Sequence, residues 1–192
     1  MYDAPKRRSK REELIKAGLE ELNQYGLDSF SIRRVAYKCG VSCAAPSKHF
    51  GDRKGFIAAI IEYVNTQWHT IQTKILEEYK DNIRVQLVEI SVCYVRFLVD
   101  NPHFRSIIML KDDDFDSVYH KMRGELSGLT QRLVNEYCNQ VNMDDDTKVR
   151  KLYVVRALIY GAALMFDNGE LEYNEHMLDV VRKNIDREFD LP

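Results

Sequence analysis

Apolar residues recur along the chain at a spacing of three or four, which is typical of helices with one buried face. We therefore predict an all-α protein of about nine helices, in which a three-helix head precedes a larger helical body. The expected ranges are, in chain order, 6–25, two short helices within 31–50, 52–79, 83–100, a short helix after 102, 115–141, one through 152–166, and 174–189.

The same spacing indicates which residues face inward. The expected buried stripes are Leu14, Ala17, Gly18, Leu22 and Tyr25 in the first helix; Phe56, Ile60, Val64, Ile71 and Ile75 in the long helix; and Leu87, Ile90, Tyr94, Phe97 and Leu98 in 83–100. Asp52 is placed to cap the long helix, and the run from Asp144 to Asp146 is placed to cap the helix that follows it. At about 1.5 Å per residue the long helix would measure roughly 40 Å, enough to join the head to the body.

The stretch from Ser31 to Phe50 has the pattern of two short helices around a tight turn. Ser31 is an expected N-cap, and Gly40 can adopt a positive φ in the turn. We expect Ser42 to cap the second helix, which would start at Cys43. Such a pair is the helix-turn-helix plan, whose second helix lies in the major groove of DNA. An ordinary helical hairpin is the alternative interpretation.

The helix through 152–166, LYVVRALIYGAALMF, contains a single charged residue, Arg156. A helix that is apolar on all sides must be buried on all sides, and a body this small needs cover from elsewhere. We expect a second copy of the chain to supply it, with the last helix joining a four-helix interface; full burial inside one chain is the alternative. The expected interface residues are Leu158, Gly161, Ala162, Met165, Leu178, Val181 and Ile185.

Charge is distributed unevenly. The 192-residue chain has a net charge of −2, but residues 1–56 hold 12 Lys and Arg against 7 Asp and Glu, whereas the remainder carries a net charge of −7. A basic head on an acidic body indicates a polyanion partner for the head alone. No run of about 18 apolar residues exists, and the charged N-terminus lacks the apolar centre of a signal peptide. We therefore expect a cytoplasmic protein without a membrane partner.

The residue types that support catalysis or metal binding are scattered. The five histidines show no metal-ligand spacing, and we find no Gly-rich phosphate loop, nucleophile elbow or His-Glu metal motif. These observations predict no metal, no cofactor and no enzymatic activity. Cys39, Cys43, Cys93 and Cys138 form no Cys-x-x-Cys pair, and we expect reduced thiols. A thiol-based redox sensor using Cys43 or another cysteine stays open as an alternative, because a helix N-terminus can lower a thiol pKa.

Motifs on both sides of the two-helix stretch identify a family. They are Ile15, Ala17-Gly18 and Tyr25-Gly26 in the first helix; Ser31, Ala36 and Cys39-Gly40-Val41-Ser42; and Ser47-Lys48-His49-Phe50 followed by Asp52-Arg53. Over residues 8–60 the chain resembles the TetR family of bacterial transcriptional regulators, which are tetracycline-repressor-like proteins. Two positions depart from the family pattern, because Ser47 replaces the usual Tyr and Pro46 replaces the commoner Leu.

The resemblance implies a homodimeric DNA-binding regulator, a repressor that a small-molecule effector releases from a palindrome-like operator. It implies a DNA-binding domain over 1–51 and a ligand-binding and dimerisation domain over 52–192. Two recognition helices would enter successive major grooves, about 34 Å apart or somewhat more. The residues expected to contact DNA are Arg33, Arg34, Ser42, Cys43, Ala44, Ala45, Ser47, Lys48, His49 and Arg53.

Family bodies also enclose a pocket between the long helix and the helices that follow it. Aromatic and methionine side chains could line such a pocket, although ordinary core packing is the alternative for each of them. The expected lining residues are Trp68, Tyr94, Phe97, Phe104, Met109, Tyr119, Met122, Tyr160 and Met165. The sequence does not identify the effector.

Overall fold

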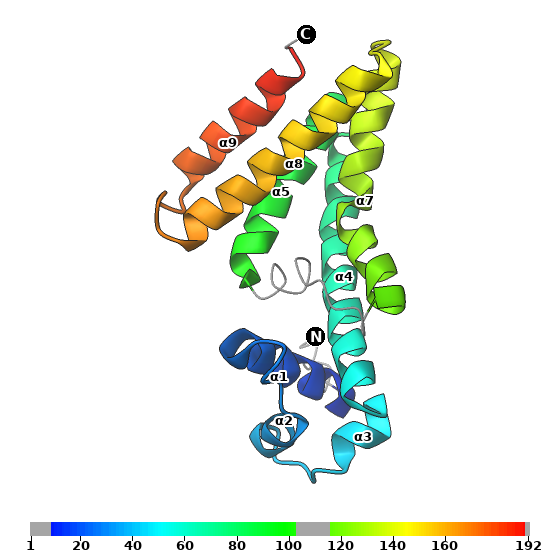
Figure 1. The fold of residues 1–192 in the computed structure, drawn as a ribbon, viewed down its shortest axis with the longest axis vertical. Coiled ribbons are helices and arrows are strands. Elements are labelled where there is room, and N and C mark those ends of the chain that lie inside the picture. The colour runs from blue at the N-terminus through cyan, green and yellow to red at the C-terminus, as the bar shows by residue number, and fades with distance from the viewer. Residues whose placement is uncertain (1–8, 103–115, 191–192) are drawn as a thin grey trace, which may run out of the picture.

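The computed structural model describes residues 9–102 and 116–190, with the side chains of 116–127 left out. All secondary structure in these residues is helical, which confirms the predicted fold class, and eight helices are described. They are α1 (Lys10–Tyr25), α2 (Ile32–Lys38), α3 (Ala45–Phe50), α4 (Arg53–Glu78), α5 (Ile83–Asp100), α7 (Asp116–Gln140), α8 (Asp145–Asp167) and α9 (Glu175–Glu188). The molecule is elongated, with α1 to α3 at one end and α5, α7, α8 and α9 at the other (Figure 1).

Most described helices begin at a residue whose side-chain oxygen accepts a hydrogen bond from a backbone N–H three residues later. This contact satisfies one of the N–H groups that a helix N-terminus leaves without a partner. The capping residues are Ser9, Ser31, Asp52, Asn82, Asp144 and Asn174. The predicted caps Ser31, Asp52 and Asp144 are therefore confirmed.

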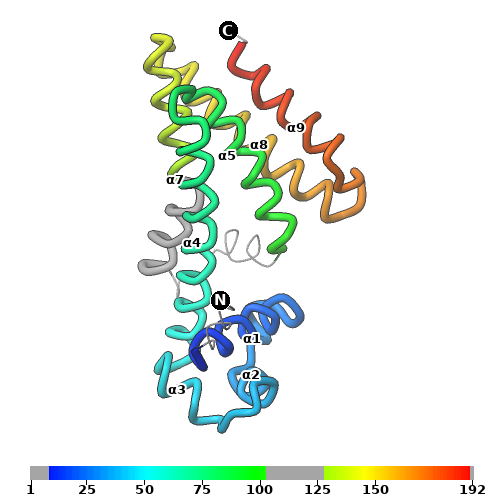
Figure 2. Tube along the Cα trace, turned by 180° about the vertical axis from the view of Figure 1, so that it is seen from behind, coloured from blue at the N-terminus to red at the C-terminus, as the bar shows by residue number. Residues whose placement is uncertain are grey.

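Two apolar cores form, and α4 contributes to both. The core of the head contains Leu14, Leu22, Phe30, Val35 and the N-terminal part of α4 from Phe56 to Ile61. The core of the body takes the later part of α4, together with α5, α7, α8 and α9. In Figure 2 α4 leaves the head and runs along the body beside α7. The proposed domain boundary at 51/52 stays a prediction.

Most of the predicted stripes are buried, and two residues are exceptions. Tyr25 is 43% exposed at the end of α1, and Ile71 is 38% exposed on α4, so both assignments were wrong. On α4, Trp68 and Gln72 are buried instead. Along its 26 residues α4 packs first against α1 and α3 and then against α5 and α7, so the residues that are buried depend on the neighbour at each turn. A single stripe drawn along the whole helix therefore fails in its second half.

Three ion pairs fix the antiparallel register of α5 and α9. Arg84 Nε lies 2.7 Å from Asp186, Arg182 Nε lies 2.7 Å from Glu89, and Arg96 lies 2.6 Å from Glu175. Between these pairs, α9 packs its apolar stripe against the core of its own chain. None of the described helices has both the length and the apolar character needed to cross a membrane.

Candidate nucleic-acid interface

The turn between α2 and α3 is closed by backbone hydrogen bonds. The Val41 N–H donates to the Ala36 carbonyl at 3.0 Å, and the Gly40 N–H donates to Tyr37 at 3.1 Å. Gly40 adopts a φ of +63°, a conformation that costs little only for glycine. Val35 and Ala36 are fully buried below the turn. The predicted helix-turn-helix is therefore present.

The start of α3 differs from the prediction. The helix begins at Ala45 and not at Cys43, and its N-cap, Ala44, makes no side-chain hydrogen bond. Ser42 lies in the preceding turn, where its carbonyl accepts from the Ala45 N–H at 2.9 Å. Pro46 occupies the first turn of α3 and is buried, as expected for a residue that needs no N–H partner there.

Aromatic stacking holds α3 against α4. The Phe50 ring stacks on Phe56 with centroids 4.1 Å apart, and Phe30 meets Phe56 edge to face at 5.5 Å. The α3–α4 junction also needs a residue without a side chain. A Cβ at Gly55 would lie 2.1 Å from the Phe50 carbonyl oxygen. The recognition helix is therefore rigidly placed on the long helix.

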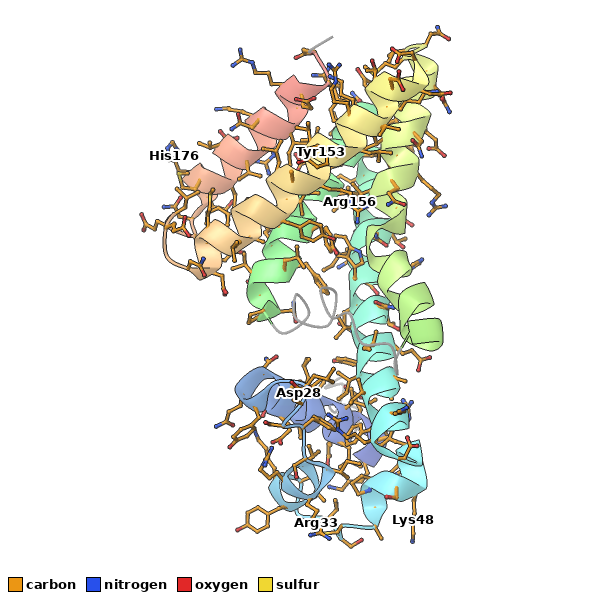
Figure 3. All side chains as sticks on the ribbon, viewed as in Figure 1. Asp28, Arg33, Lys48, Tyr153, Arg156 and His176 are labelled. Carbon is orange, nitrogen blue, oxygen red and sulfur yellow. The ribbon has the colours of Figure 1, made fainter. Side chains whose placement is uncertain are left out.

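The exposed surface of this unit carries most of the side chains predicted to contact DNA. Arg33, Ser42, Cys43, Ala44, Ser47, Lys48 and His49 are exposed, and Ala45 is half-buried. Arg33 and Lys48 point away from the body at the same end of the molecule (Figure 3). Neither of them forms an ion pair with a carboxylate in the part of the chain that the structure describes. Their positive charges are available to a polyanion.

Two of the predicted DNA contacts are already engaged inside the head. The Arg34 guanidinium donates to Glu21 and to the Ser29 carbonyl, and it lies 4.2 Å from the Tyr25 ring centroid. The Arg53 guanidinium donates to the Leu27 carbonyl, which joins α4 to the α1–α2 link. These two arginines position the α2–α3 unit through contacts within the protein, and their contact with DNA stays a prediction.

The sequence analysis did not predict a structural role for Glu21, although a charged residue on an apolar helix face indicates one. It is a carboxylate on the apolar stripe of α1, three residues after Gly18, and only 6% of its surface is exposed. Its Oε1 accepts from the Ser31 N–H at 3.1 Å and from Arg34 Nε at 2.7 Å. The hydrogen bond from Arg34 to Glu21 raises the pKa of Arg34. Glu21 thus fixes the start of α2.

The cysteines offer little support for the thiol-sensor alternative. Burial raises the pKa of Cys39, Cys93 and Cys138, which disfavours the reactive thiolate. Cys43 is exposed, but it precedes α3 and is not its first residue. The helix N-terminus that was expected to activate this thiol therefore begins two residues later.

The body contains a cavity between α7 and α8, with α5 at its base. It leaves about 10 Å³, room for scarcely more than one water molecule. The described residues that line it are Tyr94, Thr130, Gln131, Val134, Leu152, Val155, Arg156, Ile159 and Tyr160. The predicted lining consisted only of aromatic and methionine side chains, so Thr130 and Arg156 were not among the predicted residues.

Of the predicted pocket residues whose side chains the structure describes, Tyr94 and Tyr160 line this cavity and the others do not. Trp68 and Phe97 pack against Tyr94, with ring centroids 5.2 Å and 6.4 Å from it, and Met165 is 43% exposed on α8. Phe104 and Met109 lie outside the described residues, as do the side chains of Tyr119 and Met122.

The residues predicted for a dimer interface divide into two groups. Leu178, Val181 and Ile185 of α9 and Ala162 of α8 are buried in the core of the single chain, and their assignment to an interface stays a prediction. Leu158 and Gly161 are half-buried, and Met165 is exposed. The stripe on α9 faces inward because α5 and α8 already cover it.

The helix-turn-helix region is similar in sequence to known bacterial regulators. A family model described as "Bacterial regulatory proteins, tetR family" matches residues 14–60, from α1 into the first part of α4. The HTH-type transcriptional regulator BetI of Proteus mirabilis (strain HI4320) is 28% identical over 82 residues. That match covers 41% of this chain and 41% of BetI, so less than half of the relative's length is aligned.

Solved structures share the fold over nearly the whole chain. A protein of unknown function from Rhodococcus sp. RHA1 has a TM-score of 0.74 at 23% identity, covering 98% of this chain and 97% of that one. The transcriptional regulator FadR from Bacillus subtilis, in complex with stearoyl-CoA, has a TM-score of 0.72 at 9% identity, covering 93% and 96%. The helix-turn-helix geometry and the family match show that residues 14–60 are similar to the TetR family of bacterial regulatory proteins, and the solved structures share the fold of the whole chain.

Proposed function

We propose that the protein is a homodimeric transcriptional repressor in the bacterial cytoplasm. It binds a palindrome-like operator through the α2–α3 unit and leaves DNA when a small-molecule effector binds the body. The observation that carries the DNA-binding part is the exposed end of the head, where Arg33 and Lys48 project without a described carboxylate partner. The family match covers this same region.

The two basic side chains have different expected roles. Lys48 lies in the recognition helix, where it can donate to the O6 and N7 acceptors of guanine, and Ala44 just before it can contact a thymine methyl. Arg33 lies in the first turn of α2, where a long cation suits a phosphate. Ser47 and His49 are exposed beside Lys48 and complete the contact surface.

The outer face of α8 supports the dimer. Val149, Tyr153 and Leu164 are 67%, 73% and 53% exposed, and their spacing places them on one side of the helix with Gly161. An apolar stripe of this kind is unusual on the surface of a monomer. A second copy of the same helix fits it, because the small Gly161 permits close approach and the stripe can match itself across a two-fold axis.

The effector part is supported by the connection between the body and the head. A single rigid helix, α4, contributes to both cores, so a displacement in the body moves the recognition helix. The FadR structure, which shares the fold, was solved with stearoyl-CoA, so a small-molecule ligand is compatible with this architecture. Binding would favour a dimer whose recognition helices have the wrong separation.

Selection of bound sequences from random DNA tests the DNA-binding proposal. It should enrich a palindrome with half-sites about one helical turn apart or somewhat more. With that operator, Lys48→Ala should lose about 1–3 kcal/mol of binding free energy and relax specificity at one position. Arg33→Ala should weaken operator and scrambled DNA alike and reduce the salt slope by about one.

A matched control is Lys74→Ala, which removes an exposed lysine from α4 far along the chain from α3. It should leave both affinities unchanged. The proposal is overturned if no sequence is enriched, or if Lys48→Ala and Lys74→Ala have the same effect.

Sedimentation tests the dimer separately. Tyr153→Glu places a charge in the proposed interface and should convert the dimer to a monomer. Tyr37→Glu changes another exposed tyrosine, 90% accessible in the head, and should leave the mass unchanged. A wild-type monomer at micromolar concentration would contradict the proposed assembly.

A further inference from the structure

A groove of about 350 Å³ lies on the surface of the head, between the last turns of α1 and the exposed side of α2. The described residues that line it all belong to these two helices. From α1 they include Gln24 and Tyr25, and from α2 they include Arg33 and Tyr37. The groove is therefore separate from the cavity in the body, and it combines aromatic rings with positive charge.

Ion pairs with α1 fix the rotation of α2. Arg34 pairs with Glu21, and Lys38, one turn later on the same side of α2, pairs with Glu20. Because the two pairs join successive turns of α2 to α1, they prevent α2 from turning about its own axis. One side of α2 is thereby held against the protein, and the orientation of the neighbouring side is set by it.

That neighbouring side carries Arg33 and Tyr37, which are four residues apart and so lie one above the other. Neither side chain makes a hydrogen bond or an ion pair with any residue that the structure describes. Tyr37 is 90% exposed, more than any other large apolar side chain in the described ranges. Arg33 points away from the body, at the end of the molecule that also carries Lys48 (Figure 3). The groove thus shares Arg33 with the end of the head that is proposed to face DNA.

The lining matches the chemistry of a sugar–phosphate backbone. The Arg33 guanidinium, the Tyr37 hydroxyl and the Gln24 amide are hydrogen-bond donors, and all three side-chain types are common phosphate contacts in protein–DNA complexes. The Tyr25 ring, 43% exposed, offers an apolar surface on which a deoxyribose can pack. Because Arg33 has no carboxylate partner among the described residues, the groove favours an anionic occupant.

We propose that this groove seats the sugar–phosphate backbone of DNA beside the major groove that α3 enters, with Arg33 and Tyr37 donating to phosphate oxygens and Gln24 lining the opposite side. This inference rests on the proposed function, because it extends the DNA interface of that regulator onto α1. Neither Tyr37 nor Gln24 was among the residues predicted to contact DNA. Phosphate contacts carry no base information, so the groove fixes the orientation of the head on the duplex.

The first test measures binding of the full chain to a random-sequence duplex by fluorescence anisotropy, at about 50 and about 200 mM salt. Tyr37→Phe should bind about tenfold more weakly, because each dimer loses two hydrogen bonds to phosphate. Its salt dependence should stay that of the wild type, since no charge is removed, and its melting temperature should not change. Tyr173→Phe, which removes a hydroxyl from the α8–α9 link of the body, should bind DNA like the wild type.

A second pair of variants separates occupancy of the groove from the overall charge of the head. Gln24→Glu places a carboxylate in the groove, whereas Asn23→Asp makes the same change of charge at the adjacent exposed residue of α1, which does not line it. Gln24→Glu should weaken DNA binding at least fivefold more than Asn23→Asp. Equal losses for the two variants would overturn the proposal.

Failure of this inference can be told apart from failure of the proposed function. If the wild type binds DNA and both Tyr37→Phe and Gln24→Glu bind equally well, the proposed function stands and the groove is left to an acidic protein partner, which overturns the inference. If the wild type binds no DNA, the proposed function itself fails. With a selected operator, methylphosphonate replacement of single phosphates should weaken the wild type at one position in each half-site where Tyr37→Phe shows no further loss.

Discussion

Substitution of Gly55 by alanine tests the junction between the recognition helix and the long helix. On helix propensity alone the change should stabilise α4, because alanine is favoured over glycine by up to about 1 kcal/mol in a helix. The structure predicts the opposite sign. The added Cβ would lie 2.1 Å from the Phe50 carbonyl oxygen, and such atoms essentially never approach within 3.0 Å, so the two helices must separate by about 0.9 Å.

The size of the destabilisation depends on how easily the Phe50 backbone can move away from the added Cβ. The obstructing atom is backbone and not the end of a flexible side chain, and the Phe50 ring is stacked on Phe56 at 4.1 Å. Overpacking typically costs about 1–3 kcal/mol, and a rigid neighbour places this site at the upper end. After the gain in propensity, Gly55→Ala should destabilise the protein by about 2 kcal/mol. For a chain of this size that lowers the melting temperature by about 4–8 °C.

Thermal unfolding followed by circular dichroism measures the effect. Gly128→Ala is the matched control, because a Cβ there meets no atom within 4 Å and should raise the melting temperature by about 2–4 °C. Since the displaced helix is α3, Gly55→Ala should also weaken operator binding below its own melting temperature. A Gly55→Ala protein that melts at or above the wild-type temperature would refute the reasoning.

Three further changes test other parts of the molecule. The Arg96 guanidinium lowers the pKa of Glu175, so the ion pair between α5 and α9 stabilises the fold at neutral pH. This stabilisation is lost as the pH falls through the lowered pKa of Glu175. The fall in melting temperature on acidification should therefore be smaller in Glu175→Gln than in the wild-type protein. Gly161→Ala should stabilise an isolated chain by up to about 1 kcal/mol, since its Cβ meets nothing within 4 Å, yet raise the dimer dissociation constant measured by sedimentation. Lys151→Met removes a fully buried ammonium that donates to the Glu188 carbonyl at the end of α9 and should cost about 1–3 kcal/mol in urea unfolding; an unchanged midpoint would contradict it.

The head was predictable because its determinants are local. Ser31 and Asp52 cap the helices that follow them, and Gly40 turns the chain through its own φ, so sequence spacing is enough to place them. The start of α3 was misplaced by two residues for the same local reason. Ser42 is a good capping residue by type, but Pro46 fits the first turn of a helix that begins at Ala45.

The roles of individual arginines could not be predicted from spacing. Arg33 and Arg34 are neighbours in sequence, yet Arg33 is exposed without an ion pair to any described residue, and Arg34 pairs with Glu21 of α1. Arg53 likewise bonds to the Leu27 carbonyl, 26 residues earlier. Whether an arginine is held by contacts within the head depends on which chain segment lies beside it.

The amino-acid sequence by itself determined the all-helical class, the helix-turn-helix head, the capping residues and the resemblance to the TetR family, because each depends on residues within a few turns of one another. Only the tertiary structure decided which apolar faces stay exposed and which polar atoms lack partners. The inward stripe of α9, the open face of α8 and the buried hydroxyls of Tyr94 and Thr130 arise from helices distant in sequence. Burial is a property of those neighbours, and no local pattern records it.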